Sequence, residues 1–322
     1  MWFIFAVICL LGWGFADLFY KKSSDSGDKH SHLKIAVWVG IVMGLAAVAI
    51  LIFVPGATFS FSNLLIYSPA SAMYILSMII GYAGMRYLEI SIVSPVQNAS
   101  GAVSAVMMVI YFIAIGKISD IGEELDWLSI AGTVAICIGM VLLAVTERKV
   151  ALSENPTAPK KFKTGAAALI FPILYCVFDA LGTFADGVIL EGNSYFGIET
   201  VSHEMSEWDV LVAYGITFFL VAVVCWIIMA VKGEVYNPIK DKDKAIAACF
   251  EEFGQIFYVF ALADKPYYTA PIVASYCIVS VILSRIFLKE KLTKKQYVCI
   301  FIIIAGIVAM GIAEGLAELG GE

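Results

Sequence analysis

Apolar stretches as long as a lipid bilayer is thick recur along this chain of 322 residues. Each is close to the ~20 residues that a helix needs to cross the hydrocarbon core. Backbone groups inside a bilayer must pair within their own segment, so we expect each stretch to form a helix. We find ten such spans, at about 2 to 20, 35 to 54, 68 to 85, 90 to 116, 127 to 145, 165 to 190, 210 to 231, 245 to 263, 267 to 284 and 296 to 313. The predicted fold class is an all-α polytopic membrane protein with ten transmembrane helices.

Composition and charge agree with this prediction, since 61% of the residues are hydrophobic and only 15% are charged. Of the 21 Lys and Arg residues, all but Lys117 and Lys265 fall in connections on one side of the predicted bundle. The positive-inside rule assigns that side to the cytoplasm and puts both termini outside. The first span lacks a basic start and a small-residue cleavage site, so we expect it to be retained. The predicted location is the cell (cytoplasmic) membrane, as a multi-pass protein.

The two halves of the chain share motifs in the same order. The fourth span begins ISIVSPVQNASGAVSAVMM and the ninth YYTAPIVASYCIVSVILSR, each with a proline followed by small residues. GWGFADLF in the first span and YCVFDALGTF in the sixth each place an aspartate near aromatic residues. Because five spans is an odd number, the second half is inverted relative to the first, an architecture of secondary transporters. We predict a 5+5 inverted repeat, with halves at 1–146 and 165–322 and a basic cytoplasmic linker at 147–164.

One segment is similar to a known family. Residues Ser280 to Met310, SVILSRIFLKEKLTKKQYVCIFIIIAGIVAM, resemble the closing motif of EamA-type members of the drug/metabolite transporter superfamily. MRYLEISIVSPVQNAS resembles the corresponding element of the first half, although its hairpin, IAIGKISDIGEELDW, departs from the pattern. The resemblance implies a ten-helix carrier with a central cavity. It names no solute, and we carry over no substrate ligand from it.

Every ionisable residue inside the predicted spans is acidic. These residues are Asp17, Asp179, Asp186, Glu251 and Glu252. A charge at the bilayer centre costs roughly 3 kcal/mol even on the lenient insertion scale, so each is a candidate functional group. Arg86 and Arg285 lie at span ends, where their side chains can snorkel to the headgroups. We therefore expect a cation from outside, either a proton or a substrate, to neutralise the carboxylates.

Helical spacing divides the two adjacent glutamates of the eighth span. Glu251, Gln255 and Tyr258 are spaced i, i+4, i+7 and share one face, whereas Glu252 points about 100° away. We expect Glu251 to face a cavity and Glu252 to lie against a neighbouring helix as a protonated, structural group. The predicted proton-coupling residues are Asp179, Glu251 and Glu252.

Similar stripes pair an aromatic residue with a carboxylate in two other spans, Trp13 with Asp17 and Tyr175 with Asp179. Aromatic faces beside carboxylates suit an organic cation, particularly a quaternary ammonium. A proton and the cation would compete for the carboxylates in an exchanger, or bind different carboxylates in a symporter, as the halves rock. The predicted substrate-binding residues are Trp13, Asp17, Tyr74, Asn98, Tyr175, Asp179, Glu251, Gln255 and Tyr258.

Plainer explanations remain open for several of these residues. Asp17 lies near the predicted cytoplasmic end of its span, where it could simply pair with a lysine one turn away. Asp186 lies near the outer end and could be solvated. Asn98 and Gln97 follow Pro95, so they could bind substrate or only satisfy backbone groups that the proline leaves unpaired.

Other functions and partners are less well supported. Zwitterionic amino acids or related metabolites are the alternative substrates, since their ammonium group suits the same carboxylates. An intramembrane enzyme is disfavoured because no span offers a histidine to activate Ser100. A membrane receptor is disfavoured because no connection is long enough for a signalling domain. We expect no metal and no cofactor. The expected partners are lipid, a small-molecule substrate and, in a coupled mechanism, protons; no nucleic acid is expected.

Overall fold

The computed structural model of the chain describes residues 1–23, 28–85, 90–118, 126–154, 170–191, 205–287 and 292–320. Over these ranges the chain is helical and has no β-strand. The helices are α1 (Trp2–Ser23), α2 (Ser31–Phe53), α3 (Phe61–Gly84), α4 (Ile90–Asn98), α5 (Ser100–Ala114), α7 (Trp127–Glu154), α9 (Ile170–Leu190), α10 (Glu207–Val231), η3 (Pro238–Lys240), α11 (Lys242–Asp264), α12 (Pro266–Ala274), α13 (Cys277–Phe287) and α14 (Lys294–Gly320). Every predicted span contains a helix, so the predicted fold class of an all-α polytopic membrane protein is confirmed.

Length and hydropathy of these helices match a bilayer. Nine helical segments in the described ranges are long and apolar enough to cross a membrane, with α4–α5 and α12–α13 each forming one segment. The remaining predicted span is α7, whose apolar part is the shorter stretch Trp127–Leu143. Large apolar side chains such as Ile110, Val231 and Phe301 are exposed on the outside of the bundle, as expected where lipid is the solvent.

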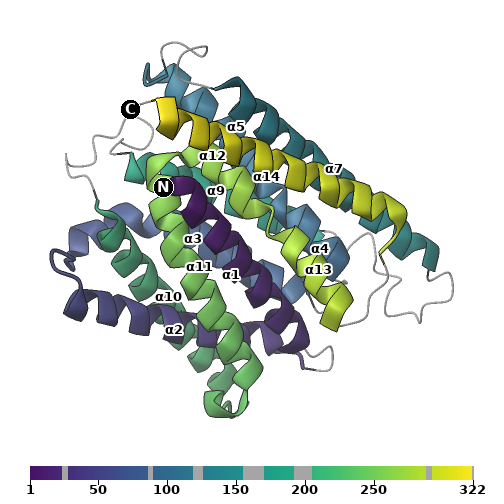
Figure 1. Cartoon of the computed structure of the whole chain (residues 1–322). Coiled ribbons are helices and arrows are strands. Elements are labelled where there is room, and N and C mark those ends of the chain that lie inside the picture. Colours follow the sequence, from purple (N-terminus) through teal and green to yellow (C-terminus); the bar gives the residue numbers. More distant parts are fainter. Residues whose placement is uncertain are drawn as a thin grey trace.

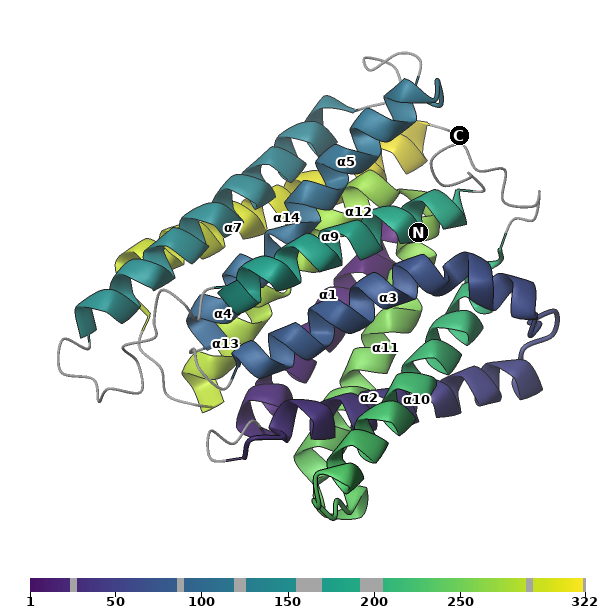
Figure 2. The ribbon, with the colours of Figure 1, turned by 180° about the vertical axis from the view of Figure 1, so that it is seen from behind.

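Contacts between the helices follow a paired pattern. α7 and α14 lie side by side along one edge of the molecule, and α2 and α10 cross at the opposite edge (Figure 1 and Figure 2). Between these edges α1 packs against α11, and α3 packs against α9. In the predicted repeat α1 corresponds to α9, and α3 corresponds to α11. The contact of α1 with α11 is therefore the counterpart of the contact of α9 with α3. This pattern supports the inverted repeat, which stays a prediction.

The fourth and ninth spans are each broken about one turn after a proline. α4 ends and α5 begins around Ala99, after Pro95, and α12 ends before Ser275, after Pro271. At the second break the Tyr276 N–H donates to the Val273 carbonyl at 3.0 Å, a tighter i to i−3 bond than an α-helix makes. Discontinuous helices with exposed backbone polar groups are typical of substrate sites in membrane carriers.

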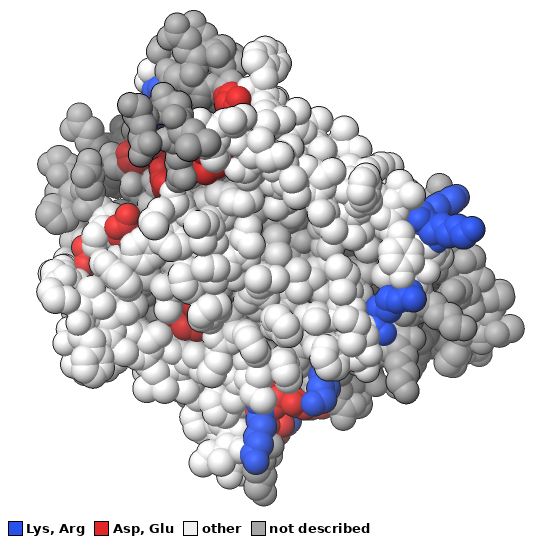
Figure 3. All heavy atoms as spheres, viewed as in Figure 1, with Lys and Arg blue, Asp and Glu red and all other residues white. Residues whose placement is uncertain are grey.

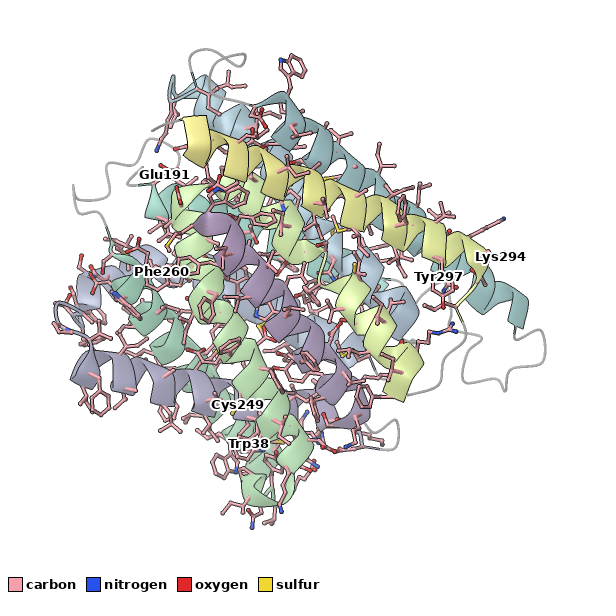
Figure 4. All side chains as sticks on the ribbon, viewed as in Figure 1. Trp38, Glu191, Cys249, Phe260, Lys294 and Tyr297 are labelled. Carbon is pink, nitrogen blue, oxygen red and sulfur yellow. The ribbon has the colours of Figure 1, made fainter. Side chains whose placement is uncertain are left out.

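Charged side chains on the surface lie mainly toward the ends of the helices. In Figure 3 a broad band of mostly uncharged residues separates the acidic residues, mainly at upper left, from the basic residues at the lower and right margins. Glu191 and Lys294 illustrate the two ends in Figure 4. This distribution agrees with the predicted orientation, in which the basic end is cytoplasmic.

Two predictions concern residues near the basic end that the structure covers only in part. Helix α7 continues to Glu154, past the predicted end of its span at 145 and into the predicted linker at 147–164. The rest of that linker, and Arg86, lie outside the described residues.

A candidate solute-binding cavity

The polar faces of the helices meet at a cavity of about 60 Å³ in the interior of the bundle. Its wall is built by α1, α3, α4, α5, α9, α10, α11 and α12, together with Tyr276 at the break after α12. The wall includes all nine residues that we predicted to bind substrate, which are Trp13, Asp17, Tyr74, Asn98, Tyr175, Asp179, Glu251, Gln255 and Tyr258. Side chains distant in the sequence are thus brought to one place, although their contact with a substrate remains a prediction.

Two carboxylates on the wall are held by serine hydroxyls from the broken spans. Asp17 Oδ2 accepts hydrogen bonds from Ser94 Oγ at 2.9 Å and from Ser280 Oγ at 2.8 Å. Asp179 Oδ2 accepts from Ser100 Oγ at 2.6 Å. Such bonds to ionised acceptors are stronger than those between neutral groups, so they fix the carboxylates in position.

Glu251 adds a third carboxylate from α11. It is close enough to Asp17 and to Asp179 to be repelled by each of them when both groups are ionised. None of the described residues that line the cavity is Lys, Arg or His. The wall therefore concentrates negative charge without a basic side chain to balance it.

Aromatic rings cover much of the remaining wall. The Trp13 ring lies 5.1 Å from the Tyr258 ring and 5.8 Å from the Tyr276 ring, the latter edge to face. Trp13 Nε1 donates to the Glu251 carbonyl at 3.1 Å, so the indole is locked against the helix that carries Glu251. This contact needs Gly254, because a Cβ there would lie 2.3 Å from Trp13 Cδ1. Ring faces are thereby fixed next to the carboxylates.

A cluster centred on Tyr74 adjoins the cavity and corrects one expectation. The Tyr74 and Tyr258 hydroxyl oxygens lie 2.8 Å apart, and the Tyr74 hydroxyl donates to Thr183 Oγ1 and Asp186 Oδ2, each at 3.3 Å. Asp186 is 0% exposed, so the expectation that it could be solvated is wrong. Its position near the end of α9 does not expose it, because α3 packs along α9 and covers that turn.

The structure also shows which groups Asp17 and Asn98 bind, which bears on the two plainer explanations: that Asp17 pairs with a lysine and that Asn98 satisfies backbone groups. Asp17 is 4% exposed and is bonded to serines, while Lys21 Nζ donates to the Met85 carbonyl at 3.4 Å. Asn98 Nδ2 donates to the Ser94 carbonyl at 2.8 Å, so its amide supports α4 from the cavity wall. Glu252 is buried but does not line the cavity.

Several wall residues were not among the predicted ligands. They are Tyr20, Met78, Gly81, Tyr82, Met85, Gln97, Ser100, Gly101, Thr183, Tyr214, Ala270, Val273, Ala274 and Tyr276. All are uncharged and most are common on packing faces, so hydropathy and charge give no signal for them; of these residues, only Gln97 is a possible ligand on sequence grounds. In the described ranges no group of three or more His, Cys, Asp or Glu side chains is placed to hold a metal ion.

Comparison with known proteins agrees with the architecture around this cavity. Residues 194–312 match the EamA-like transporter family. The match, which lies within the second half of the chain, confirms the resemblance noted in the sequence. A solved crystal structure of a protein covers 95% of this chain and 99% of its own with a TM-score of 0.61, at 11% sequence identity, which is a likeness of fold alone.

A sequence relative is half as long as this chain. An uncharacterized protein of Methanocaldococcus jannaschii is 29% identical over 149 residues, which are 46% of this chain and 98% of that protein. A sequence the length of one predicted half is thus found as a separate protein. The division of this chain into two five-helix units stays a prediction.

Proposed function

We propose that this protein is a secondary active transporter that moves a small organic cation by alternating access. The observation that carries the proposal is the convergence of Asp17, Asp179 and Glu251 on one cavity whose described wall has no basic residue. An ionised carboxylate away from water is costly unless it is paired or protonated. A cation that enters the cavity removes that cost, and a neutral or anionic solute does not.

Aromatic rings make an organic cation a better fit than a metal ion. Trp13, Tyr258 and Tyr276 contact one another on the wall, and ring faces attract ammonium groups by about 0.5–2 kcal/mol each, depending on desolvation. A bare metal ion would instead need several oxygen ligands at short distance. The combination of carboxylates and rings favours a methylated or primary amine.

Transport requires the bundle to open. A cavity of about 60 Å³ holds a few water molecules at ~10–15 Å³ each, so an organic solute enters only when the surrounding helices move apart. The breaks in the fourth and ninth spans provide natural hinges beside the cavity. Rocking of the halves about these breaks would expose the carboxylates to each side in turn.

Protons are the proposed coupling ion. Asp179 and Glu251 line the cavity, so a proton and the cation would compete for them, and each carboxylate would carry one or the other through the closed state. Glu252, buried and next to Glu251, is a further proposed proton site that does not contact the substrate. The alternative substrates, zwitterionic amino acids, would place their ammonium group on the same carboxylates.

Transport assays in proteoliposomes test the proposal. Currents or uptake would be measured for choline, polyamines, cationic amino acids and neutral amino acids, with and without a pH gradient. We expect saturable transport of cations that is lost in Asp179→Asn and Glu251→Gln. Glu252→Gln should keep cation binding and lose only the dependence of uptake on the pH gradient, because it removes a proposed proton site that lies outside the cavity. Transport of neutral or anionic solutes that survives both cavity substitutions would overturn the proposal.

A further inference from the structure

Two glutamines on the cavity wall have N–H donor groups for which no described residue supplies an acceptor. Gln97 on α4 and Gln255 on α11 are each 2% exposed, and both line the cavity that holds the carboxylates. The Nε2 group of each is fully buried and has no hydrogen-bond partner among the described residues. Amide donors buried in this way are rare in folded proteins, where roughly 90% or more of buried polar groups are paired.

Other polar groups of the same wall are paired only in part. Asn98 donates to Ser94, and Ser100 donates to Asp179. The Tyr20 and Tyr82 hydroxyl groups, also on the wall, lack a partner among the described residues, but a hydroxyl can donate or accept, whereas a glutamine Nε2 group only donates. The arrangement is typical of groups that meet a ligand instead of the protein.

Both amides are held where a substrate on the carboxylates would reach them. Gln255 follows Glu251 by four residues on α11, so the two side chains share a face of that helix. Gln97 Nε2 lies against the backbone of Gly81, where an added Cβ would be only 2.8 Å away. A bulkier residue than glycine at 81 would push the amide out of this position.

The chemistry of these groups adds a second requirement to the substrate. Carboxylates attract an ammonium group, but an N–H donor needs an acceptor, which an alkylammonium ion or a polyamine does not have. An unpaired buried donor costs about 1–3 kcal/mol, and a substrate oxygen that accepts from it recovers that cost. A site built in this way rejects an analogue that lacks the oxygen.

We propose that the transported cation carries an oxygen acceptor near its ammonium group, and that Gln97 and Gln255 bind that oxygen. This inference rests on the proposed function and narrows the cation to amino alcohols, in which a hydroxyl lies a few bonds from the nitrogen. For the alternative zwitterionic substrates, betaines and amino acids, the acceptor would be the carboxylate. Glu251 and the aromatic rings hold the ammonium end, and the two amides select the oxygen end.

Binding of two compounds that differ only at the oxygen tests the inference. Choline and propyltrimethylammonium have the same charge and nearly the same shape, but a methyl group replaces the hydroxyl in the second. We would measure both by isothermal titration calorimetry on the purified protein in lipid nanodiscs. Glycine betaine, as a third compound, distinguishes a carboxylate from a hydroxyl as the preferred acceptor.

We expect the wild-type protein to bind choline or glycine betaine about tenfold or more tighter than propyltrimethylammonium. In Gln97→Leu and Gln255→Leu this preference should fall toward unity while affinity for propyltrimethylammonium is retained, which shows that each variant is folded. Equal wild-type affinities for all three would overturn the inference and leave the proposed function standing. Failure of every ammonium compound to bind would overturn the proposed function and the inference together.

Discussion

The two halves of the molecule share a packing framework and differ at the cavity wall. α2 from the first half and α10 from the second cross closely, and each helix contributes a glycine that lies against the backbone of the other. A Cβ on Gly40 would lie 2.3 Å from the Phe218 carbonyl oxygen, and one on Gly215 would lie 2.4 Å from the Met43 carbonyl oxygen. The same close approach thus occurs twice, once at a glycine of each half, as the predicted repeat would require.

Around the cavity the correspondence breaks down. The predicted repeat pairs Trp13 on α1 with Tyr175 on α9. Gly254 on α11 accommodates the Trp13 ring and Gly81 on α3 accommodates the Tyr175 ring, so these two glycines are equivalent in the repeat. Three residues before them stand Glu251 in the second half and Met78 in the first, and both line the cavity. A symmetric frame therefore carries an asymmetric wall, which would give a bound cation one preferred orientation.

Removing the Glu251 carboxylate, which has Met78 as its counterpart in the predicted repeat, should have the largest effect on cation affinity. Glu251→Gln takes one of three negative charges from the wall, and loss of a desolvated charge partner costs about 2–5 kcal/mol, or roughly 30-fold or more in affinity. Cation binding measured by titration calorimetry checks this. Met78→Leu, at the matched position, should bind normally; an equal loss in both variants would mean that the wall acts through packing and not through charge.

Filling the glycine contacts comes next and tests the shared frame. Gly40→Ala and Gly215→Ala each force a methyl group against a carbonyl oxygen, and overpacking of this kind costs about 1–3 kcal/mol of stability. Thermal unfolding in detergent should show similar losses for the two. Gly315→Ala is the control, because an added Cβ there meets nothing within 4 Å. A large loss in one variant and none in the other would contradict the framework symmetry.

Serine hydroxyls should distinguish the matched aspartates by a smaller margin. Ser100→Ala removes the hydroxyl 2.6 Å from Asp179, whereas Ser280→Ala leaves Asp17 its bond from Ser94. We expect roughly a tenfold rise in KM for Ser100→Ala, because a hydrogen bond to a charged group contributes about 1.5–3 kcal/mol. We expect only about a few-fold rise for Ser280→Ala, because the second donor partly replaces the lost bond. KM values from proteoliposome uptake check the order, and the reverse order would show that Ser94 does not support Asp17.

The smallest effect concerns an ion pair between the first turn of α2 and the connection that follows α10. Lys34 contacts both Asp28 and Glu234. Its hydrogen bond to Glu234 holds the pKa of that carboxyl below its usual value. This stabilisation is present at neutral pH and is lost as the pH falls through the lowered pKa. Glu234→Gln should therefore unfold at a slightly lower temperature than the wild type at pH 7, and the difference should vanish in acid; a gap that persists there would exclude a charge effect.

How far the sequence predicted this molecule depended on the kind of signal. All ten spans were found, because bilayer thickness sets helix length and hydropathy reads it directly. Carboxylates such as Asp179 stood out for the same reason, since charge is rare in spans. Tyr276 and Tyr214 did not stand out, because uncharged aromatic residues are common on packing faces. Burial of Asp186 was missed because it depends on neighbouring helices and not on position along α9.

The most direct test compares each of several ammonium solutes with its neutral carbon isostere, for example choline with 3,3-dimethyl-1-butanol, in binding to the wild-type protein. The two members of a pair have nearly the same size and shape, so any difference in affinity reports the charge. If the acidic, aromatic cavity is a cation site, only the charged members bind, and Glu251→Gln weakens them. Neutral members that bind as tightly as their charged partners would contradict the account.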